Sequence, residues 1–274
     1  MTQTLPAPRR VAIAGALGRM GHAIAAAVEA HPGLAVGVVC DRPGTEGGEL
    51  HGLRLVTPAT ALESADVLID FTTAAAGAAL AAYAAQRVRD GATGNPALII
   101  GATGATAEEE AVIRRAADVV PIVRALNFSL GVNILAGIVE ETARRLAARD
   151  WDIEIFEAHH KRKVDAPSGT AIQLGRAAAK GRGVNLDDVS DRVRDGHPGA
   201  RKEGDIGFSV MRGGGIVGEH TVSFIAEDEI ITFAHSARER SLFARGAVEA
   251  AAWVLGKPPG LYAMSDVLGF TGQT

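Results

Sequence analysis

Short apolar runs alternate with amphipathic helical stretches through the first half of the chain. The apolar run at residues 10–14 predicts a strand, and a second run lies at residues 34–40. Between them, apolar side chains recur at the three- and four-residue spacing of one helical face: Leu17, Met20, Ile24 and Val28. Further runs end near Phe71, Gly101 and Val123, with helical stretches around residues 74–87 and 107–118 between them. This alternation predicts an α/β domain with a doubly wound, Rossmann-type parallel sheet.

The pattern changes after Ser129. A long amphipathic helix at residues 130–149 precedes a strand at 152–159 and a helix at about 168–180. After a polar, glycine-rich stretch, three strand-like runs follow closely, at residues 206–212, 219–226 and 229–235, and we expect them to pair antiparallel. A last helix is expected at residues 242–255. The pattern predicts two domains, residues 1–128 and 129–240, the second of the α+β class with a mixed sheet.

Composition and charge narrow the class of protein. The 274 residues include 28 Lys and Arg against 32 Asp and Glu, a formal charge of -4, which argues against a nucleic-acid-binding protein. The single Cys excludes a disulfide framework and a cysteine-rich zinc site, and it suits a reducing compartment. The sequence contains neither an apolar run of the roughly 18 residues that span a bilayer nor a secretory signal in its first residues. We therefore expect a cytoplasmic protein that binds no membrane.

A glycine-rich turn joins the first strand to the first helix. Glycines 15, 18 and 21 permit a sharp turn, close approach of the backbone to a pyrophosphate, and packing of the helix on the strand, respectively. Asp41 follows Gly21 by 20 residues, at the end of the second strand, where an acid accepts ribose hydroxyls. Arg42 beside it could hold a 2'-phosphate, so both NADH and NADPH are candidate cofactors. The alternative is an ordinary helix start with packing glycines and a solvated aspartate.

Two later strand ends fall where a doubly wound sheet collects ligand contacts. One is Gly101, Ala102 and Thr103, and the other is Ala125, Leu126, Asn127 and Phe128. Threonine and asparagine side chains there can hydrogen-bond a nicotinamide amide. Taken alone, each segment could equally be an ordinary connection between a strand and a helix.

The densest cluster of reactive side chains is a run of cationic or potentially cationic residues: His159, His160, Lys161, Arg162 and Lys163. Pro167 and Ser168 then predict a helix entry, where Ser168, Gly169 and Thr170 supply N–H and hydroxyl donors at the positive end of the helix. Cations beside a helix N-terminus predict an anion site, most simply for a dicarboxylate. The HExxH spacing of a helix-borne zinc site is absent, and no metal is expected. The alternative is an exposed basic loop without a special function.

Residues 157–171 closely resemble the active-site signature of the dihydrodipicolinate reductase family. The glycine turn, the segments 70–72 and 127–133, and the Val-Gly-Glu-His-Thr segment 217–221 follow in the same order as in that family, so the resemblance covers nearly the whole chain. The chain departs from the family pattern at Ala74, Ala102 and Leu126, where the family has Pro, Thr and a small residue.

The resemblance implies hydride transfer from NADH or NADPH to a cyclic, unsaturated dicarboxylate in diaminopimelate and lysine synthesis. It implies that residues 15–20 (Gly15, Ala16, Leu17, Gly18, Arg19, Met20), Asp41, Arg42, 101–103 and 125–128 contact the cofactor. His159 and Lys163 match the catalytic pair, and the substrate contacts are His160, Lys163, Ser168, Gly169 and Thr170. The family also implies a homotetramer, formed through the second domain, and a C-terminal segment 241–274 that completes the first domain.

Two other functions share parts of this pattern. One is another NAD(P)-dependent imine or amino-acid reductase, such as an aspartate dehydrogenase, which would share the glycine turn but has no reason to carry the histidine and lysine signature. The other is a non-enzymatic NAD(P) sensor, which could lose the proton donors that this chain keeps.

Overall fold

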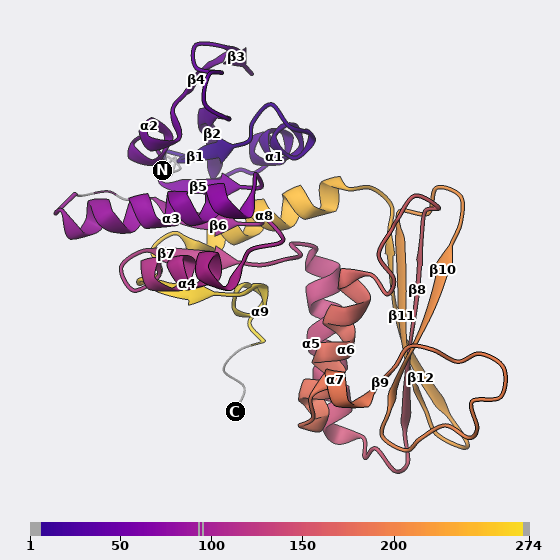
Figure 1. Cartoon of the computed structure of the whole chain (residues 1–274). Helices are drawn as coiled ribbons and strands as arrows, with labels where there is room; N and C mark the ends of the chain where they lie inside the picture. Colours follow the sequence, from indigo (N-terminus) through magenta and orange to yellow (C-terminus); the bar gives the residue numbers. More distant parts are fainter. Residues whose placement is uncertain (1–6, 93, 95, 271–274) are drawn as a thin grey trace, which may run out of the picture. The chain divides into compact units, whose positions relative to one another are not determined.

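The computed structural model describes residues 7–92, 94 and 96–270, which separate into two compact units. Unit 1 comprises the residues up to Ser129 together with those from Ser241 onward, and unit 2 is Leu130–Arg240. Each unit has its own sheet and its own hydrophobic core (Figure 1).

Unit 1 is built on an eight-stranded sheet with the strand order β13-β7-β6-β5-β1-β2-β4-β3. The strands are β1 (Arg9–Ala14), β2 (Leu34–Cys40), β3 (Glu49–Leu50), β4 (Leu53–Val56), β5 (Val67–Asp70), β6 (Ala97–Ile100), β7 (Pro121–Arg124) and β13 (Gly260–Tyr262). The helices are α1 (Arg19–Glu29), α2 (Pro58–Glu63), α3 (Ala74–Arg89), α4 (Ala107–Ala116), α8 (Ser241–Val254) and α9 (Met264–Val267). Apart from the antiparallel β3–β4 pair, neighbouring strands run parallel, so the predicted doubly wound fold is confirmed.

Apolar side chains fix the two faces of this sheet. Strands β5 and β6 are buried along their whole length, as expected where helices cover both faces of a parallel sheet. One core cluster joins alternate residues of β1, β5 and β6 to the helices α2, α3 and α4. The order of the strands reverses at β1, which pairs with β2 on one side and β5 on the other. In doubly wound sheets, ligands bind at such a switch point, beyond the carboxyl ends of the strands.

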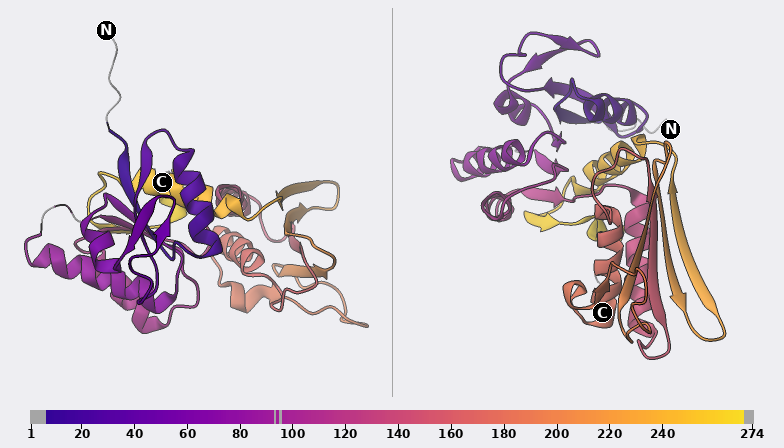
Figure 2. Two further views of the ribbon diagram at one scale, coloured as in Figure 1. Left: turned by 90° about the horizontal axis from the view of Figure 1, so that it is seen from above. Right: turned by 45° about the vertical axis from the view of Figure 1, so that its right-hand side comes forward.

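Unit 2 contains a five-stranded mixed sheet with the order β12-β11-β8-β10-β9. Its strands are β8 (Asp152–His159), β9 (Ser190–Asp191), β10 (Ile206–Arg212), β11 (Gly218–Ile225) and β12 (Ile230–Ala237), and its helices are α5 (Leu130–Arg145), α6 (Gly169–Arg182) and α7 (Leu186–Val189). Figure 2 shows α5 and α6 side by side along one face of the sheet. Buried residues of β8 and β11, such as Ile155 and Phe224, join these helices in the core.

The expected pairing of the last three strands is only partly right. β11 pairs antiparallel with β12, but β10 runs parallel to β8, which lies between β10 and β11. The short connection at residues 213–217 therefore crosses the end of β8, where the Gly213 N–H donates to the His159 carbonyl over 2.9 Å. Sequence proximity predicted a hairpin, but the crossover through α6 brings β10 beside β8 instead.

Several boundaries also differ from the sequence prediction. Helix α5 ends at Arg145 rather than 149, because the Trp151 N–H turns back to the Ala147 carbonyl and leads the chain into β8. The elements α2, α7, α9, β3, β4, β9 and β13 have no counterpart in the prediction. They are short and have few apolar positions, so their periodicity is weak.

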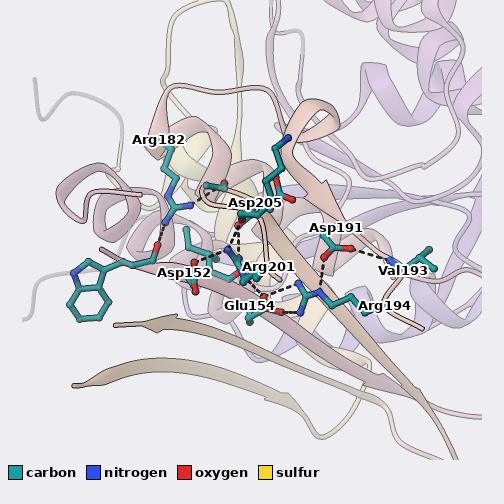
Figure 3. A network of polar contacts seen from close by, with 12 residues as sticks. Asp152, Glu154, Arg182, Asp191, Val193, Arg194, Arg201 and Asp205 are labelled. Carbon is teal, nitrogen blue, oxygen red and sulfur yellow. Dashed lines mark hydrogen bonds and ion pairs between the residues drawn. The ribbon is translucent and has the colours of Figure 1, made fainter. Parts of the chain in front are cut away.

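A polar network holds residues 191–205 against the sheet of unit 2 (Figure 3). Arg194 donates to both carboxylate oxygens of Glu154, over 2.9 and 2.8 Å. Arg201 donates to Glu154 and Asp152 over 3.0 and 2.7 Å, and also to the Ile153 and Asp205 carbonyls. This glycine-rich stretch, which has little regular structure, is thus fixed mainly by guanidinium groups.

Candidate active site

The glycine turn of unit 1 has the geometry that its sequence predicts. Gly15 has φ +73°, and a Cβ atom there would lie 2.8 Å from Cγ2 of Thr72. A Cβ atom on Gly21 would lie 2.4 Å from two backbone carbonyl oxygens, so α1 can pack this closely only with glycine. The N-cap of α1 is Gly18, which has no side chain to cover the first-turn N–H groups. The positive end of α1 is thereby suited to an anion.

Asp41 lies beside this turn, at the end of β2. Its carboxylate accepts the Leu17 N–H over 2.9 Å and the Arg42 N–H over 2.8 Å. The turn therefore fixes the position of the carboxylate, while the Arg42 side chain is exposed. An acid at this position fits the recognition of a ribose hydroxyl.

The two predicted strand-end loops of unit 1 are tied to each other. Arg124, at the end of β7, donates to the carbonyls of Ile100 and Ala125, and its guanidinium also pairs with Glu110 of α4 over 2.6 Å. The Phe71 and Phe128 rings contact each other at 5.3 Å between centroids. The sequence prediction missed Arg124, although its position at the end of a strand was a usable signal.

Within these loops, the predicted residues differ in exposure. Ala102 and Phe128 are buried, whereas Thr103 and Leu126 are exposed. Asn127 uses its side-chain oxygen to accept the Ser129 N–H over 2.9 Å. The side-chain oxygen of Asn127 therefore helps to fix the conformation of this loop.

A second group that prediction left without a role is Asp70, at the end of β5. Burial raises the pKa of its carboxyl group, against hydrogen bonds from the Thr72 N–H and hydroxyl. Its Oδ2 atom is buried without a hydrogen-bond partner among the described residues. Burial likewise raises the pKa of the Cys40 thiol, to about 12, as expected for an unreactive strand residue.

In unit 2, His159 and Glu157 form a buried pair. Both lie on the same face of β8, two residues apart. Nδ1 of His159 lies 2.6 Å from Oε2 of Glu157. Strand register brings further partners: Arg212 of β10 pairs with His159, and His220 of β11 pairs with Glu157. Neither Arg212 nor His220 was predicted as a partner of this pair, since their proximity depends on the register of the sheet.

Lys163 is joined to the same group through a loop. Its Nζ atom lies 2.8 Å from the carboxylate of Asp165, whose carbonyl accepts from Arg212 over 2.6 Å. The hydrogen bond from Lys163 lowers the pKa of the Asp165 carboxyl group. Lys163 and His159 are thus anchored to one connected set of side chains.

Helix α6 begins where prediction placed a helix entry. The Ser168 hydroxyl accepts the Ala171 N–H over 3.2 Å as the N-cap, and the Ser168 N–H donates to Glu157 over 2.8 Å. Ser168 is buried and its N–H is occupied, so the N–H groups that lead the helix are those of Gly169 and Thr170. Gly169 is exposed, and a Cβ atom there would meet no described atom within 4 Å.

The remaining histidines differ in environment. His160 follows the last residue of β8 and is partly exposed; partial burial and then the charges of Arg162 and Arg240 lower its pKa. Burial, followed by the charges of His159 and His235, lowers the pKa of His220 to about 4. His220 is therefore neutral near pH 7, and its ring lies edge-on to His159 at 5.1 Å between centroids.

The described residues contain no group of three or more His, Cys, Asp or Glu side chains placed to hold a metal ion. In the same part of the chain, none of the helices has the length and apolar content needed to cross a membrane.

Comparison with known proteins decides the family. A profile of the dihydrodipicolinate reductase N-terminus matches residues 9–128, and a profile of the C-terminus of the same proteins matches residues 131–268. The chain belongs to the dihydrodipicolinate reductase family. The 4-hydroxy-tetrahydrodipicolinate reductase of Caulobacter vibrioides is 57% identical over 96% of this chain and 98% of that protein. The protein of the same name from Rhizobium rhizogenes is 46% identical over 96% and 97%.

A solved dihydrodipicolinate reductase from Paenisporosarcina, with dipicolinate bound, has the same fold. It superposes with a TM-score of 0.75 at 22% identity, over 93% of this chain and 97% of that one. The predictions of this family, of its fold class and of an NAD(P)H-dependent oxidoreductase are confirmed. The family match favours neither of the alternatives, an aspartate dehydrogenase and a non-enzymatic sensor.

Proposed function

We propose that this chain is a 4-hydroxy-tetrahydrodipicolinate reductase, which forms tetrahydrodipicolinate from a cyclic dicarboxylate in diaminopimelate and lysine synthesis. The observation that carries the proposal is the position of His159, Lys163 and the N-terminus of α6, all anchored at one end of β8. An acid–base ring, a cation and a helix N-terminus are what a doubly charged, reducible ring needs.

Unit 1 is the dinucleotide-binding domain in this proposal. The residues of the glycine turn fit a pyrophosphate, because Gly15 and Gly21 have conformations or contacts that exclude a side chain and Gly18 leaves the helix end uncovered. Asp41 would hold the ribose, Arg42 a 2'-phosphate, and the loops 101–103 and 125–128 the nicotinamide. A bound NADH or NADPH supplies the hydride.

Unit 2 is the substrate-binding domain. The N–H groups of Gly169 and Thr170 hold one carboxylate at the positive end of α6, Lys163 adds positive charge, and His160 offers a ring N–H donor. Ser168 acts indirectly, since its hydroxyl caps the helix and its N–H is held by Glu157.

Hydride addition to the conjugated ring builds negative charge on the ring nitrogen and the adjacent carbon. His159 acts as the acid–base group and Lys163 as the proton donor that quench this charge. Proton delivery by a positioned side chain accelerates such steps by roughly 10²–10⁴-fold.

We also propose a cytoplasmic homotetramer that assembles through the face of the unit 2 sheet opposite α5 and α6. Residues of this face include Met211 and Ile230, which are 50% and 64% exposed. Light scattering of the purified chain tests the assembly, and a monomer in solution would refute it.

Reduction of freshly prepared 4-hydroxy-tetrahydrodipicolinate, followed by loss of nicotinamide absorbance, tests the activity. We expect turnover with NADH and with NADPH, and none with oxaloacetate and ammonium, which an aspartate dehydrogenase would use. Binding of either cofactor without turnover of any substrate would identify a sensor instead.

Replacing Arg42 tests the proposed 2'-phosphate contact. Arg42→Ala should raise the KM for NADPH by about tenfold, the loss of one charge-assisted contact, and change the KM for NADH little. Arg54→Ala, at a nearby arginine of β4, serves as the control. An equal effect of Arg42→Ala on both cofactors would exclude the contact.

A further inference from the structure

The carboxylate of Glu157 is surrounded by donors on every side. Oε2 accepts from Nδ1 of His159 over 2.6 Å and from Arg212 over 2.8 Å. Oε1 accepts from the Ser168 N–H and from the second guanidinium nitrogen of Arg212, each over 2.8 Å. A carboxylate offers about four acceptor positions, so the hydrogen-bonding capacity of Glu157 is filled.

These contacts determine the charge of Glu157. Burial by itself would raise the pKa of this carboxyl group, but the hydrogen bonds from Arg212, His159 and Ser168 together lower it below its usual range. The Glu157 side chain is 1% exposed and remains ionised near neutral pH. An ionised carboxylate only accepts hydrogen bonds, so Nδ1 of His159 must carry a hydrogen.

The other nitrogen of His159 faces a small residue. A Cβ atom on Gly218 of β11 would lie only 3.1 Å from Nε2, so glycine leaves room at that edge of the ring. The titratable and charged groups around His159 are Glu157 on its own strand, Arg212 on β10, His220 on β11, and His160 and Lys163 on the following loop. Glu157 is the acid among them.

We propose that Glu157 is a positioning residue for the reduction: it fixes the His159 ring with a hydrogen on Nδ1, so that Nε2 is the atom that exchanges a proton with the substrate. Through Arg212, which also holds the Asp165 carbonyl, Glu157 anchors the loop of Lys163 as well. The inference rests on the proposed function of His159 and Lys163. It adds which nitrogen reacts and which buried group makes it available.

The first measurement needs no substrate. In protein labelled with ¹⁵N-histidine, the His159 resonances of the wild type should show a hydrogen on Nδ1 in the neutral ring. Glu157→Gln should yield a mixture of the two neutral tautomers, because an amide can donate as well as accept. A wild-type His159 ring with its hydrogen on Nε2 would overturn the proposal even if the reductase activity is established.

The second measurement is the pH profile of turnover. Glu157→Gln should lower kcat by about 100-fold, within the range of general acid–base catalysis. The KM values for the cofactor and for the substrate should stay within about threefold of the wild-type values. The alkaline limb of the kcat profile should move to lower pH, because the protonated ring loses its anionic partner. Glu157→Asp keeps the charge and should restore the limb toward its wild-type position.

Glu154→Gln is the matched control, since Glu154 lies on the same strand and is also held by arginines, but has no contact with His159 among the described residues. It should leave kcat and the alkaline limb unchanged. If Glu157→Gln lowers kcat without shifting the alkaline limb, Glu157 only braces the fold. If Glu157→Gln does not fold, the same criterion is applied to Glu157→Asp. Failure of the wild type to reduce the substrate would refute the proposed function and leave the tautomer result standing.

Discussion

Two glutamates of β8, three residues apart, are both held by arginines, but in different surroundings. The Glu154 side chain is 25% exposed and receives donors from Arg194 and Arg201, which lie in the glycine-rich stretch after β9 (Figure 3). The Glu157 side chain is 1% exposed and receives donors from a strand, a helix N-terminus and a histidine ring. The spacing of three residues puts the two carboxylates on opposite faces of the strand.

The difference is why we infer a structural role for Glu154 and a role in the reaction for Glu157. Around Glu154, the partners are guanidinium groups that stay charged at all accessible pH values, so the network acts as a brace. Around Glu157, one partner is a histidine, whose ring can both donate and accept a proton. A desolvated carboxylate acts on that ring more strongly than an exposed one could, because the local dielectric is lower.

The largest effect is expected at Lys163, which is linked to Glu157 through Asp165 and Arg212. Lys163→Ala should lower kcat/KM by at least 100-fold, about 2.7 kcal/mol, because a cation and a proton source are lost together. NADH binding and the free energy of unfolding should change little, since the ion pair with Asp165 is partly exposed. Steady-state kinetics and cofactor titration measure both.

Lys180→Ala is the control for this variant, because Lys180 also forms an exposed ion pair, with Glu140 over 3.0 Å. It should leave kcat/KM unchanged. Normal turnover by Lys163→Ala would remove this lysine from the catalytic group.

Much of unit 1 follows from the sequence, because its signals are local. The apolar runs of β2 and β6 coincide with the strands, and the glycine turn predicts its own geometry at Gly15 and Gly21. Local pattern also predicted the bounds of β8 and the helix entry at Ser168, and the structure confirms both. His159 and Lys163 stand out in the sequence itself, as members of one cationic run.

What the sequence could not supply is the register of unit 2. Arg212 bonds Glu157, and His220 lies opposite it, only because β10 and β11 lie on either side of β8. Proximity along the chain predicted a different pairing for β10. Glu157 itself stands at the start of the recognised signature, and its two-residue spacing from His159 was an available signal. Its fourfold hydrogen bonding depends on long-range packing that periodicity does not encode.

A smaller effect, on the free energy of unfolding alone, is expected for Arg201 in the polar network around Glu154. Arg201→Ala should lower the free energy of unfolding by about 2 kcal/mol, since it leaves the Ile153 and Asp205 carbonyls without this donor. It should not change kcat/KM. Arg212→Ala should lower both the free energy of unfolding and kcat/KM, because Arg212 also holds Glu157 and the Lys163 loop. Urea unfolding and kinetics on both variants make the comparison, and an equal loss of kcat/KM in the two would contradict the division between brace and active site.

The smallest effect should appear as acid sensitivity. The pKa of Glu157 is lowered in the folded chain, so its contribution to stability is complete above the unfolded pKa, about 4.3, and is lost as the pH falls through the folded value. The hydrogen bond from Arg194 lowers the pKa of Asp191 in the exposed network in the same direction, but that side chain is 25% exposed and solvent weakens its contribution. Glu157→Gln should therefore flatten the fall in unfolding free energy below about pH 5 more than Asp191→Asn does. If Asp191→Asn flattened it as much, burial would not be what separates the two networks, and the positioning role of Glu157 would have to rest on its contact with His159 alone.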